Sequence, residues 1–233
     1  MIGCLVIHGY TGGPYELEPL VEYLKKETDF IFNVPTLPGH GKDLALEGST
    51  FKEWINSAEE AFKALQEKCQ TIYIIGFSMG GMIASYLAGK YDVNKLVLLA
   101  PAGKFISVKQ ISLDIGEVII DSLKGELDDN KLYTRYSHKK GAVPFKANIE
   151  FIKLVRHTRR YLGQITCPVF IAQGKQDGIV PAKTIHYLDK EIASEEKEVV
   201  LFDQSDHLIC WGDDKDILNN MVRLFLANKE AVI

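Results

Sequence analysis

The stretch Thr71-Ile72-Tyr73-Ile74-Ile75-Gly76-Phe77-Ser78-Met79-Gly80-Gly81 leads directly into Met82-Ile83-Ala84-Ser85-Tyr86-Leu87-Ala88-Gly89-Lys90. The first five residues are rich in β-branched and aromatic side chains, which predicts a buried strand, and the second stretch has a helical pattern. Between them, the pattern G-x-S-x-G predicts a nucleophile elbow, a sharp strand-to-helix turn with a serine at its tip. Glycines two residues before and after the serine leave the room that this turn needs. Ser78 is therefore the candidate nucleophile.

Further short apolar runs alternate with helical patterns along the chain. This alternation predicts an α/β fold with a mostly parallel, doubly wound sheet of about six strands and helices on both faces. The predicted strands are Gly3 to Ile7, Phe30 to Val34, Thr71 to Ile75, Lys95 to Ala100, Pro168 to Ala172 and Glu198 to Phe202. Helical spacing of apolar residues predicts further helices over residues 17–24, 51–65 and 213–228.

The interval 103–160 interrupts this alternation, because it has helical patches but no clear strand. We interpret it as a small helical cap inserted into a core formed by residues 1–102 and 161–233. The interval is locally basic, with 12 Lys and Arg against 7 Asp and Glu. Two interpretations stay open: a solvated helical surface, or a lid that shapes the substrate pocket and favours anionic groups.

Composition restricts the classes of function. The chain has 233 residues, of which 46% are hydrophobic and 25% charged, as in ordinary globular proteins. A net charge of −4 argues against a general nucleic-acid binder, which needs an excess of Lys and Arg. No apolar run approaches the length of a membrane helix. We therefore predict no nucleic-acid partner and no stable membrane insertion.

The cysteines indicate the cellular setting. Four are present, widely scattered, without a C-x-x-C pair or a Cys/His spacing that suits zinc. This pattern favours a reduced, cytoplasmic setting. The apolar N-terminal run stops at His8 and lacks a basic leader, which indicates a strand and not a signal peptide. We expect neither a metal nor an organic cofactor.

A serine nucleophile needs a base, and the base needs an acid to orient it. Asp177 follows the strand 168–172, and His207 follows the strand 198–202, so both lie in loops at strand ends. Asp203 and Asp206 are rivals to Asp177, but neighbours in one loop rarely face each other across a ring. The alternative role for Asp177 is that of a turn or helix-cap residue.

The other histidines are weaker candidates for the base. His138 and His157 fall in the insertion and His186 in a helical pattern, and none of the three follows a late strand. His8 precedes a glycine-rich loop, where bracing the loop through hydrogen bonds is the expected role.

An oxyanion hole needs two backbone donors. The elbow supplies one, the N–H of Met79, and the second must come from another loop. His8-Gly9-Tyr10-Thr11-Gly12-Gly13-Pro14 follows the first strand, and its glycines allow close approach to a substrate. The Tyr10 N–H is the candidate second donor. A phosphate-binding role for this loop is disfavoured because the G-x-x-x-x-G-K-[ST] pattern is absent.

Taken in chain order, these motifs resemble those of the α/β-hydrolase superfamily, in particular the small bacterial carboxylesterases and the related monoacylglycerol lipases. The matching segments span nearly the whole chain. They are His8-Gly9-Tyr10-Thr11-Gly12, Leu37-Pro38-Gly39-His40-Gly41, Gly76-Phe77-Ser78-Met79-Gly80-Gly81, Gly174-Lys175-Gln176-Asp177-Gly178-Ile179-Val180 and Ser205-Asp206-His207.

The resemblance implies a catalytic triad of Ser78, Asp177 and His207, backbone donors at Tyr10 and Met79, and a helical cap formed by the insertion. It also implies that the segment 38–41 shapes a tight turn. One feature departs from the family, which often has two antiparallel strands ahead of the strand that bears the His-Gly loop. We expect those strands to be missing here, which leaves one sheet edge barer and able to pair with another chain.

The predicted function is that of a serine carboxylesterase that hydrolyses short- to medium-chain esters, including monoacylglycerols, through an acyl-enzyme on Ser78. Its partner is a small-molecule ester. The alternatives within the fold are a lyase, a thioesterase, a carbon–carbon bond hydrolase and a cofactor-free haloperoxidase. A binding scaffold without catalysis is the alternative outside enzymology. Acyl-chain length and oligomeric state do not follow from the sequence.

Overall fold

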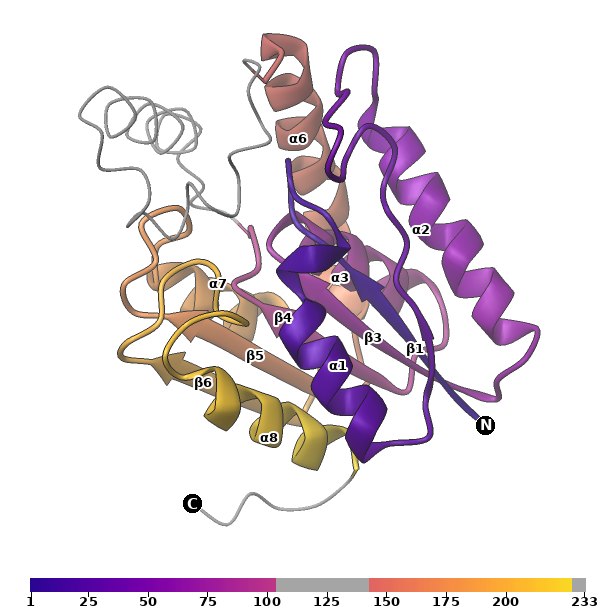
Figure 1. The fold of residues 1–233 in the computed structure, drawn as a ribbon, viewed down its shortest axis with the longest axis vertical. Helices are drawn as coiled ribbons and strands as arrows, with labels where there is room; N and C mark the ends of the chain where they lie inside the picture. Colours follow the sequence, from indigo (N-terminus) through magenta and orange to yellow (C-terminus); the bar gives the residue numbers. More distant parts are fainter. Residues whose placement is uncertain (104–142, 228–233) are drawn as a thin grey trace.

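The computed structural model of the protein describes residues 1–103 and 143–227. Its centre is one six-stranded sheet with the strand order β2-β1-β3-β4-β5-β6 (Figure 1). All neighbouring strands run parallel. The strands are β1 (Ile2–Ile7), β2 (Ile31–Asn33), β3 (Thr71–Phe77), β4 (Lys95–Leu99), β5 (Val169–Gly174) and β6 (Lys197–Phe202). The six predicted strands and the parallel sheet are confirmed.

The register of the sheet brings the strand ends together. Ile7 at the end of β1 pairs with Gly76, and Phe77 at the end of β3 pairs with Leu99. Gly174, which ends β5, pairs with Phe202, which ends β6. Because the strands are parallel, the loops that follow β1, β3, β5 and β6 all leave from the carboxyl edge of the sheet. Ligands of open α/β sheets bind outside this edge.

Helices cover both faces of the sheet. On one face lie α1 (Glu18–Glu27) and α8 (Lys215–Leu226), which contact each other in front of the sheet in Figure 1. The other face is covered by α2 (Phe51–Gln66), α3 (Met79–Lys90), α6 (Phe145–Thr158) and α7 (Lys183–Glu191). Successive strand residues point to opposite faces: Leu5 and Ile7 enter the core under α2 and α3, while Cys4 and Val6 enter the core under α1 and α8.

Two helices illustrate how local sequence specifies this arrangement. A capping box starts α2, in which the Thr50 side chain accepts from the Glu53 N–H and the Glu53 carboxylate accepts from the Thr50 N–H. Helix α3 is apolar on all sides, and its residues from Met79 to Ala88 are buried. A helix buried all round belongs in the interior, and α3 packs against β3, α6 and the 3-10 helix η3 (Arg159–Gln164).

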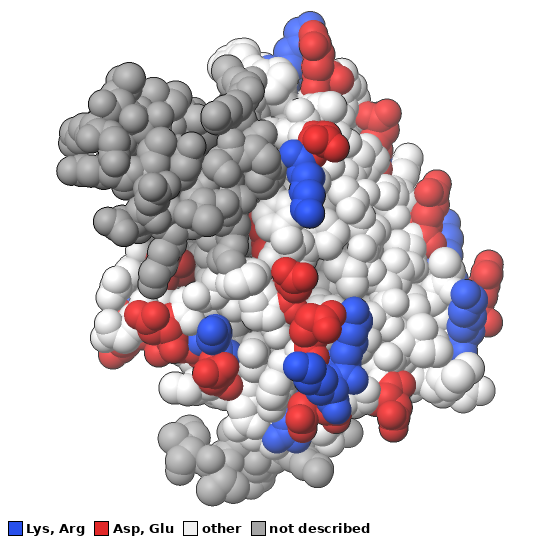
Figure 2. Space-filling model, in the orientation of Figure 1, with Lys and Arg blue, Asp and Glu red and all other residues white. Residues whose placement is uncertain are grey.

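Most of the predicted insertion, residues 104–142, lies outside the described residues. Its C-terminal part includes α6, which packs against α2 and α3. Across the described parts of the chain, no helix combines the length and apolar character required to span a bilayer. On the face shown in Figure 2, acidic and basic side chains are interspersed over the described surface.

Candidate active site

The turn between β3 and α3 holds Ser78 in an unusual backbone conformation, with φ 52° and ψ −115°. Positive φ is uncommon for residues other than glycine and persists only where surrounding contacts enforce it. Here the Ser78 N–H donates to the Leu99 carbonyl at 2.9 Å. The Ser78 carbonyl accepts from the N–H groups of Gly81 at 3.1 Å and Ala102 at 3.0 Å. These bonds anchor the serine in the conformation expected of a nucleophile elbow.

The glycines around Ser78 are sterically required. A Cβ on Gly76 would lie 2.4 Å from the Gly80 carbonyl oxygen, and a Cβ on Gly80 would lie 2.2 Å from the Ile7 carbonyl oxygen. Real Cβ atoms do not approach backbone oxygens this closely, so any side chain would displace the turn or the end of β1. The two glycines therefore leave the room that the strand-to-helix turn needs, which is the role inferred from the sequence.

The side chain of His207 lies between Ser78 and Asp177. Its Nε2 lies 3.0 Å from Ser78 Oγ, and its Nδ1 lies 2.7 Å from Asp177 Oδ2. The carboxylate accepts a hydrogen bond from Nδ1–H, which leaves the lone pair of Nε2 free to accept the serine hydroxyl proton. All three residues are buried. The structure thus brings together the three residues that the sequence placed after β3, β5 and β6.

The carboxylate of Asp177 is fixed by further bonds. Its Oδ1 accepts from the N–H groups of Ile179 and Val180, both at 2.8 Å. Its Oδ2 also accepts from Gln173 Nε2 at 2.6 Å. Four donors on one carboxylate hold its oxygens in a single orientation toward the imidazole of His207.

The two rival aspartates have other partners. Asp203 is exposed and forms an ion pair with Lys175 at 2.6 Å. Asp206 Oδ1 accepts from the Leu208 N–H at 2.8 Å. Neither carboxylate takes the place beside Nδ1 of His207, so the choice of Asp177 as the partner agrees with the geometry.

Nearby carboxylates and burial have opposite effects on the pKa of His207. Burial lowers the pKa of this imidazole, but the negative charge and hydrogen bond of Asp177 act in the opposite direction. The more distant carboxylates of Glu16 and Asp206 add to the effect of Asp177. The net result is a pKa of His207 above its usual value, so an imidazolium is stabilised in this site.

The two predicted oxyanion donors, Met79 and Tyr10, follow the neighbouring strands β3 and β1. Met79 is the first residue of α3, and the N–H of a first helical residue has no intrahelical acceptor. Tyr10 lies in the loop after β1, the strand that neighbours β3. Its side chain is engaged elsewhere: the ring stacks on Phe151 of α6 at a centroid distance of 4.6 Å, and the hydroxyl donates to Asn148 Oδ1 at 3.0 Å.

His8 braces the loop that contains Tyr10, as expected. Its Nδ1–H donates to the Gly9 carbonyl at 2.9 Å, and its Nε2 accepts from the Leu37 N–H at 3.0 Å. The segment 38–41 forms a tight turn, with positive φ at Gly39 and Gly41. Of the other histidines, His157 lies in α6 and His186 in α7, while His138 lies outside the described residues.

Comparison with known proteins identifies the family. The model of the Hydrolase_4 family, described as serine aminopeptidase S33, matches residues 3–214. The chain belongs to this family of α/β hydrolases. The hydrolase is also 30% identical, over 221 residues, to a thermostable monoacylglycerol lipase of Bacillus sp. (strain H-257). That alignment covers 93% of this chain and 87% of the relative.

Further relatives and solved structures agree with this assignment. A carboxylesterase of Bacillus subtilis (strain 168) is 22% identical over 238 residues, which cover 95% of the hydrolase and 91% of the relative. A solved structure from work on LipS and LipT, two metagenome-derived lipolytic enzymes, superposes on the hydrolase with a TM-score of 0.78 at 21% sequence identity. It covers 97% of the hydrolase and 94% of that chain, and shows the same fold. The predicted resemblance to α/β hydrolases is confirmed.

Two polar residues of the hydrolase that contact the site were missed by sequence reasoning. The side-chain Nε2 of Gln173 donates to Asp177 Oδ2, and it also donates to the Val180 carbonyl at 3.0 Å. A polar residue in the otherwise apolar strand β5 was the available signal. Glu16 is buried beside the loop 8–13, where its Oε2 accepts from the Gly9 N–H at 2.8 Å. In sequence it resembles an ordinary acidic residue at a helix start.

Within the described ranges of the hydrolase, His, Cys, Asp and Glu side chains form no group of three able to hold a metal ion. The four cysteines are free, and burial raises the pKa of the Cys167 thiol to about 11. Among the described residues, the imidazole of His207 and, through it, the carboxylate of Asp177 are hydrogen-bonded to Ser78 Oγ. This set suits nucleophilic attack and proton transfer.

Proposed function

We propose that the protein is a serine carboxylesterase that uses Ser78 as nucleophile, His207 as general base and acid, and Asp177 as the residue that orients His207. One observation carries this proposal: the imidazole of His207 bridges Ser78 Oγ at 3.0 Å and Asp177 Oδ2 at 2.7 Å. A serine hydroxyl is a weak nucleophile until such a base removes its proton.

The reaction has two halves in this proposal. His207 Nε2 takes the proton of Ser78 Oγ as that oxygen attacks the ester carbonyl, and the N–H groups of Tyr10 and Met79 stabilise the oxyanion. His207 then gives the proton to the leaving alcohol, which leaves an acyl group on Ser78. Water, deprotonated by the same imidazole, attacks the acyl-enzyme and releases the carboxylic acid.

Short- to medium-chain esters, including monoacylglycerols, are the proposed substrates. The 30% identity to a monoacylglycerol lipase and the 22% identity to a carboxylesterase support this class. Contact between Tyr10 and two residues of α6, Asn148 and Phe151, supports the proposal that the interval 103–160 forms a cap over the core. Neither the proposed chemistry nor the proposed residues use a metal or an organic cofactor.

A fluorophosphonate probe and a series of p-nitrophenyl esters from acetate to laurate test this function. We expect the wild-type protein to be labelled and to hydrolyse the esters, and Ser78→Ala to do neither while keeping its circular dichroism spectrum. Ester turnover by Ser78→Ala at the wild-type rate would contradict the assignment of Ser78. Labelling without ester turnover would redirect the search to thioesters and to carbon–carbon bond cleavage.

A further inference from the structure

A buried carboxylate lies inside the loop that carries the proposed oxyanion donor. Glu16 ends the 3-10 helix η1 (Pro14–Glu16) and is only 2% exposed. Its Oε2 accepts from the Gly9 N–H at 2.8 Å. The same carboxylate presses against Gly12, where a Cβ would lie 1.9 Å from Oε2. Glu16 therefore lies against the loop 8–13, and a side chain at position 12 would displace its carboxylate from the place where it accepts from the Gly9 N–H.

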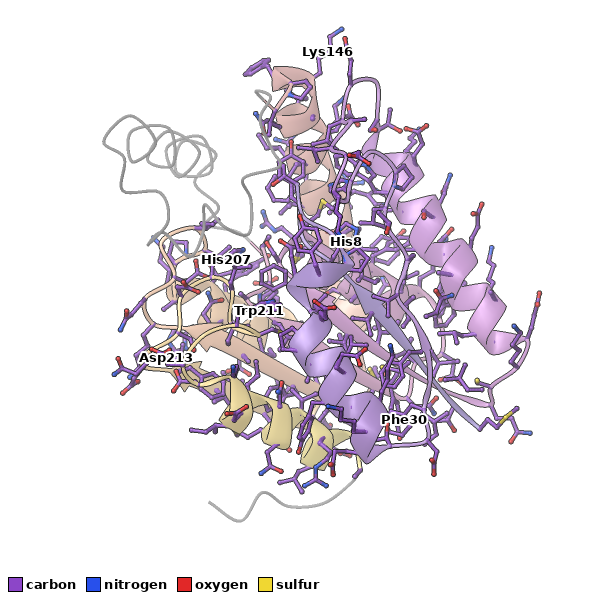
Figure 3. The ribbon with its side chains drawn as sticks, in the orientation of Figure 1. His8, Phe30, Lys146, His207, Trp211 and Asp213 are labelled. Carbon is purple, nitrogen blue, oxygen red and sulfur yellow. The ribbon has the colours of Figure 1, made fainter. Side chains whose placement is uncertain are left out.

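The same turn is tied to the loop that bears His207. The indole Nε1–H of Trp211 donates to the carbonyl oxygens of Tyr15 and Glu16, both at 3.1 Å. Trp211 itself lies in a turn closed by its N–H, which donates to the Leu208 carbonyl at 2.7 Å. In Figure 3, His8, His207 and Trp211 lie in the same central region of the molecule. Glu16 thus stands between the oxyanion loop and the histidine loop.

We infer that Glu16 is a positioning residue of the proposed esterase, which orients the Gly9–Tyr10 backbone for the oxyanion and places a second negative charge near His207. This inference rests on the proposed function. A carboxylate is costly to bury unless it is hydrogen-bonded, so the burial of Glu16 needs a reason. The Glu16 carboxylate accepts from the Gly9 N–H. This bond fixes the His8–Gly9 peptide, which directly precedes the Gly9–Tyr10 peptide that carries the Tyr10 N–H.

The charge of Glu16 gives the inference a measurable signature. Among the described residues, the charged groups that act on His207 are Asp177 from the loop after β5, Glu16 from η1 and Asp206 from the loop of His207 itself. Burial lowers the pKa of His207, and these three carboxylates raise it. Removing the charge of Glu16 while keeping its shape should therefore lower the pKa of His207. A role confined to packing would leave that pKa where it is.

The experiment measures the second-order rate of fluorophosphonate labelling as a function of pH. In this reaction Ser78 Oγ bonds to phosphorus, fluoride leaves, and His207 takes the serine proton, so the rate falls where His207 is protonated. The variants are Glu16→Gln, which keeps an acceptor for the Gly9 N–H, and Glu16→Ala, which does not. Glu18→Gln is the matched control, because Glu18 is exposed and two residues away.

We expect the acid limb of the Glu16→Gln profile to move to lower pH, with the Glu18→Gln profile unchanged. Glu16→Ala should be labelled about 10- to 100-fold more slowly at the pH optimum, because its oxyanion loop loses a fixed orientation.

Two results would overturn the inference: an acid limb of Glu16→Gln that coincides with the wild type, or a folded Glu16→Ala that is labelled within twofold of the wild-type rate. If Glu16→Ala does not fold, the Glu16→Gln profile decides alone. A wild-type protein that resists labelling and hydrolyses no ester instead refutes the proposed function, so the two failures are distinguishable.

Discussion

Asp177 follows β5 and His207 follows the adjacent strand β6, and the two side chains are joined by a hydrogen bond of 2.7 Å. This bond assigns the proton of the imidazole to Nδ1 and directs the lone pair of Nε2 toward Ser78. The pairing depends on the sheet, because Gly174 and Phe202, which precede the two loops, are paired in the β5–β6 register.

If the proposed triad is correct, Asp177→Asn should lower kcat by about 10⁴-fold with little change in the fold, as the corresponding change does in a Ser–His–Asp protease. The amide keeps the shape of the carboxylate but donates toward Nδ1, which favours the wrong tautomer. Steady-state kinetics with p-nitrophenyl butyrate measure the loss. Asp203→Asn is the control, because Asp203 is exposed and lies in the neighbouring loop. Comparable losses in both variants would contradict the role given to Asp177.

The activity should decline on the acid side at a pH above that of an unperturbed histidine. Burial lowers the pKa of His207, but Asp177, Glu16 and Asp206 together raise it above its usual value. Only the neutral imidazole accepts the serine proton, so kcat/KM should fall as pH drops through this raised pKa. A pH profile of kcat/KM measures the limb. A midpoint below that of free imidazole would show that burial outweighs the carboxylates.

The contribution of His207 to the free energy of unfolding should decrease as pH rises, whereas the activity should increase. The folded state binds the His207 proton more tightly than the unfolded state, whose histidine pKa is about 6.5. The stabilisation is therefore complete below the unfolded pKa and is lost as pH rises through the folded pKa. Urea unfolding of wild type and His207→Gln across this window should show the free-energy difference shrinking as pH rises. His186→Gln, at an exposed position of α7, is the control.

Gly80→Ala should destabilise the fold by about 1–3 kcal/mol, the usual cost of overpacking, or prevent folding. Its Cβ would lie 2.2 Å from the Ile7 carbonyl oxygen and 2.5 Å from that of His8. Gly178→Ala is the control, because no atom lies within 4 Å of its Cβ position. Its free energy of unfolding should change by no more than about 0.5 kcal/mol. Denaturant unfolding measures both, and equal effects would exclude the steric explanation.

Ser78→Gly should be more stable than Ser78→Ala by about 1 kcal/mol. The φ of 52° at position 78 strains any residue with a Cβ, and glycine relieves the strain at some cost in chain entropy. Both variants should be inactive, so activity does not influence the comparison. The measurement is the urea midpoint of each variant. A less stable Ser78→Gly would mean that the elbow is not strained.

Local sequence patterns were enough to predict the sheet and the positions of Ser78, Asp177 and His207 at the carboxyl edge of its strands. The strand and helix around Ser78 were predictable from periodicity, and the positions of Asp177 and His207 followed from the rule that such residues come after strands. The strand ends were less exact: β3 continues to Phe77, and α3 begins at Met79, ahead of the predicted start. The positive φ of Ser78 lets the chain turn without intervening residues.

Long-range polar contacts could not be predicted. From the sequence, Glu16 resembles an acidic residue at a helix start, whereas in the fold its carboxylate accepts from the Gly9 N–H. The Trp211 indole donates to the carbonyl of Tyr15, which is 196 positions away in the sequence. Gln173 interrupts an apolar strand, a signal that predicts a polar neighbour without saying which. Such contacts depend on how elements pack, whereas period and spacing report only on single elements.

The contacts between Tyr10 and α6 have a consequence for protein engineering. The ring of Tyr10 stacks on Phe151, and its hydroxyl donates to Asn148, so residues far apart in sequence form one joint. Grafting over positions 145–158 a segment without the counterparts of Asn148 and Phe151 would break both contacts unless position 10 were exchanged with it. Chimeras meant to alter substrate range must therefore transplant these positions as a matched set, or turnover will suffer for reasons unrelated to the new pocket.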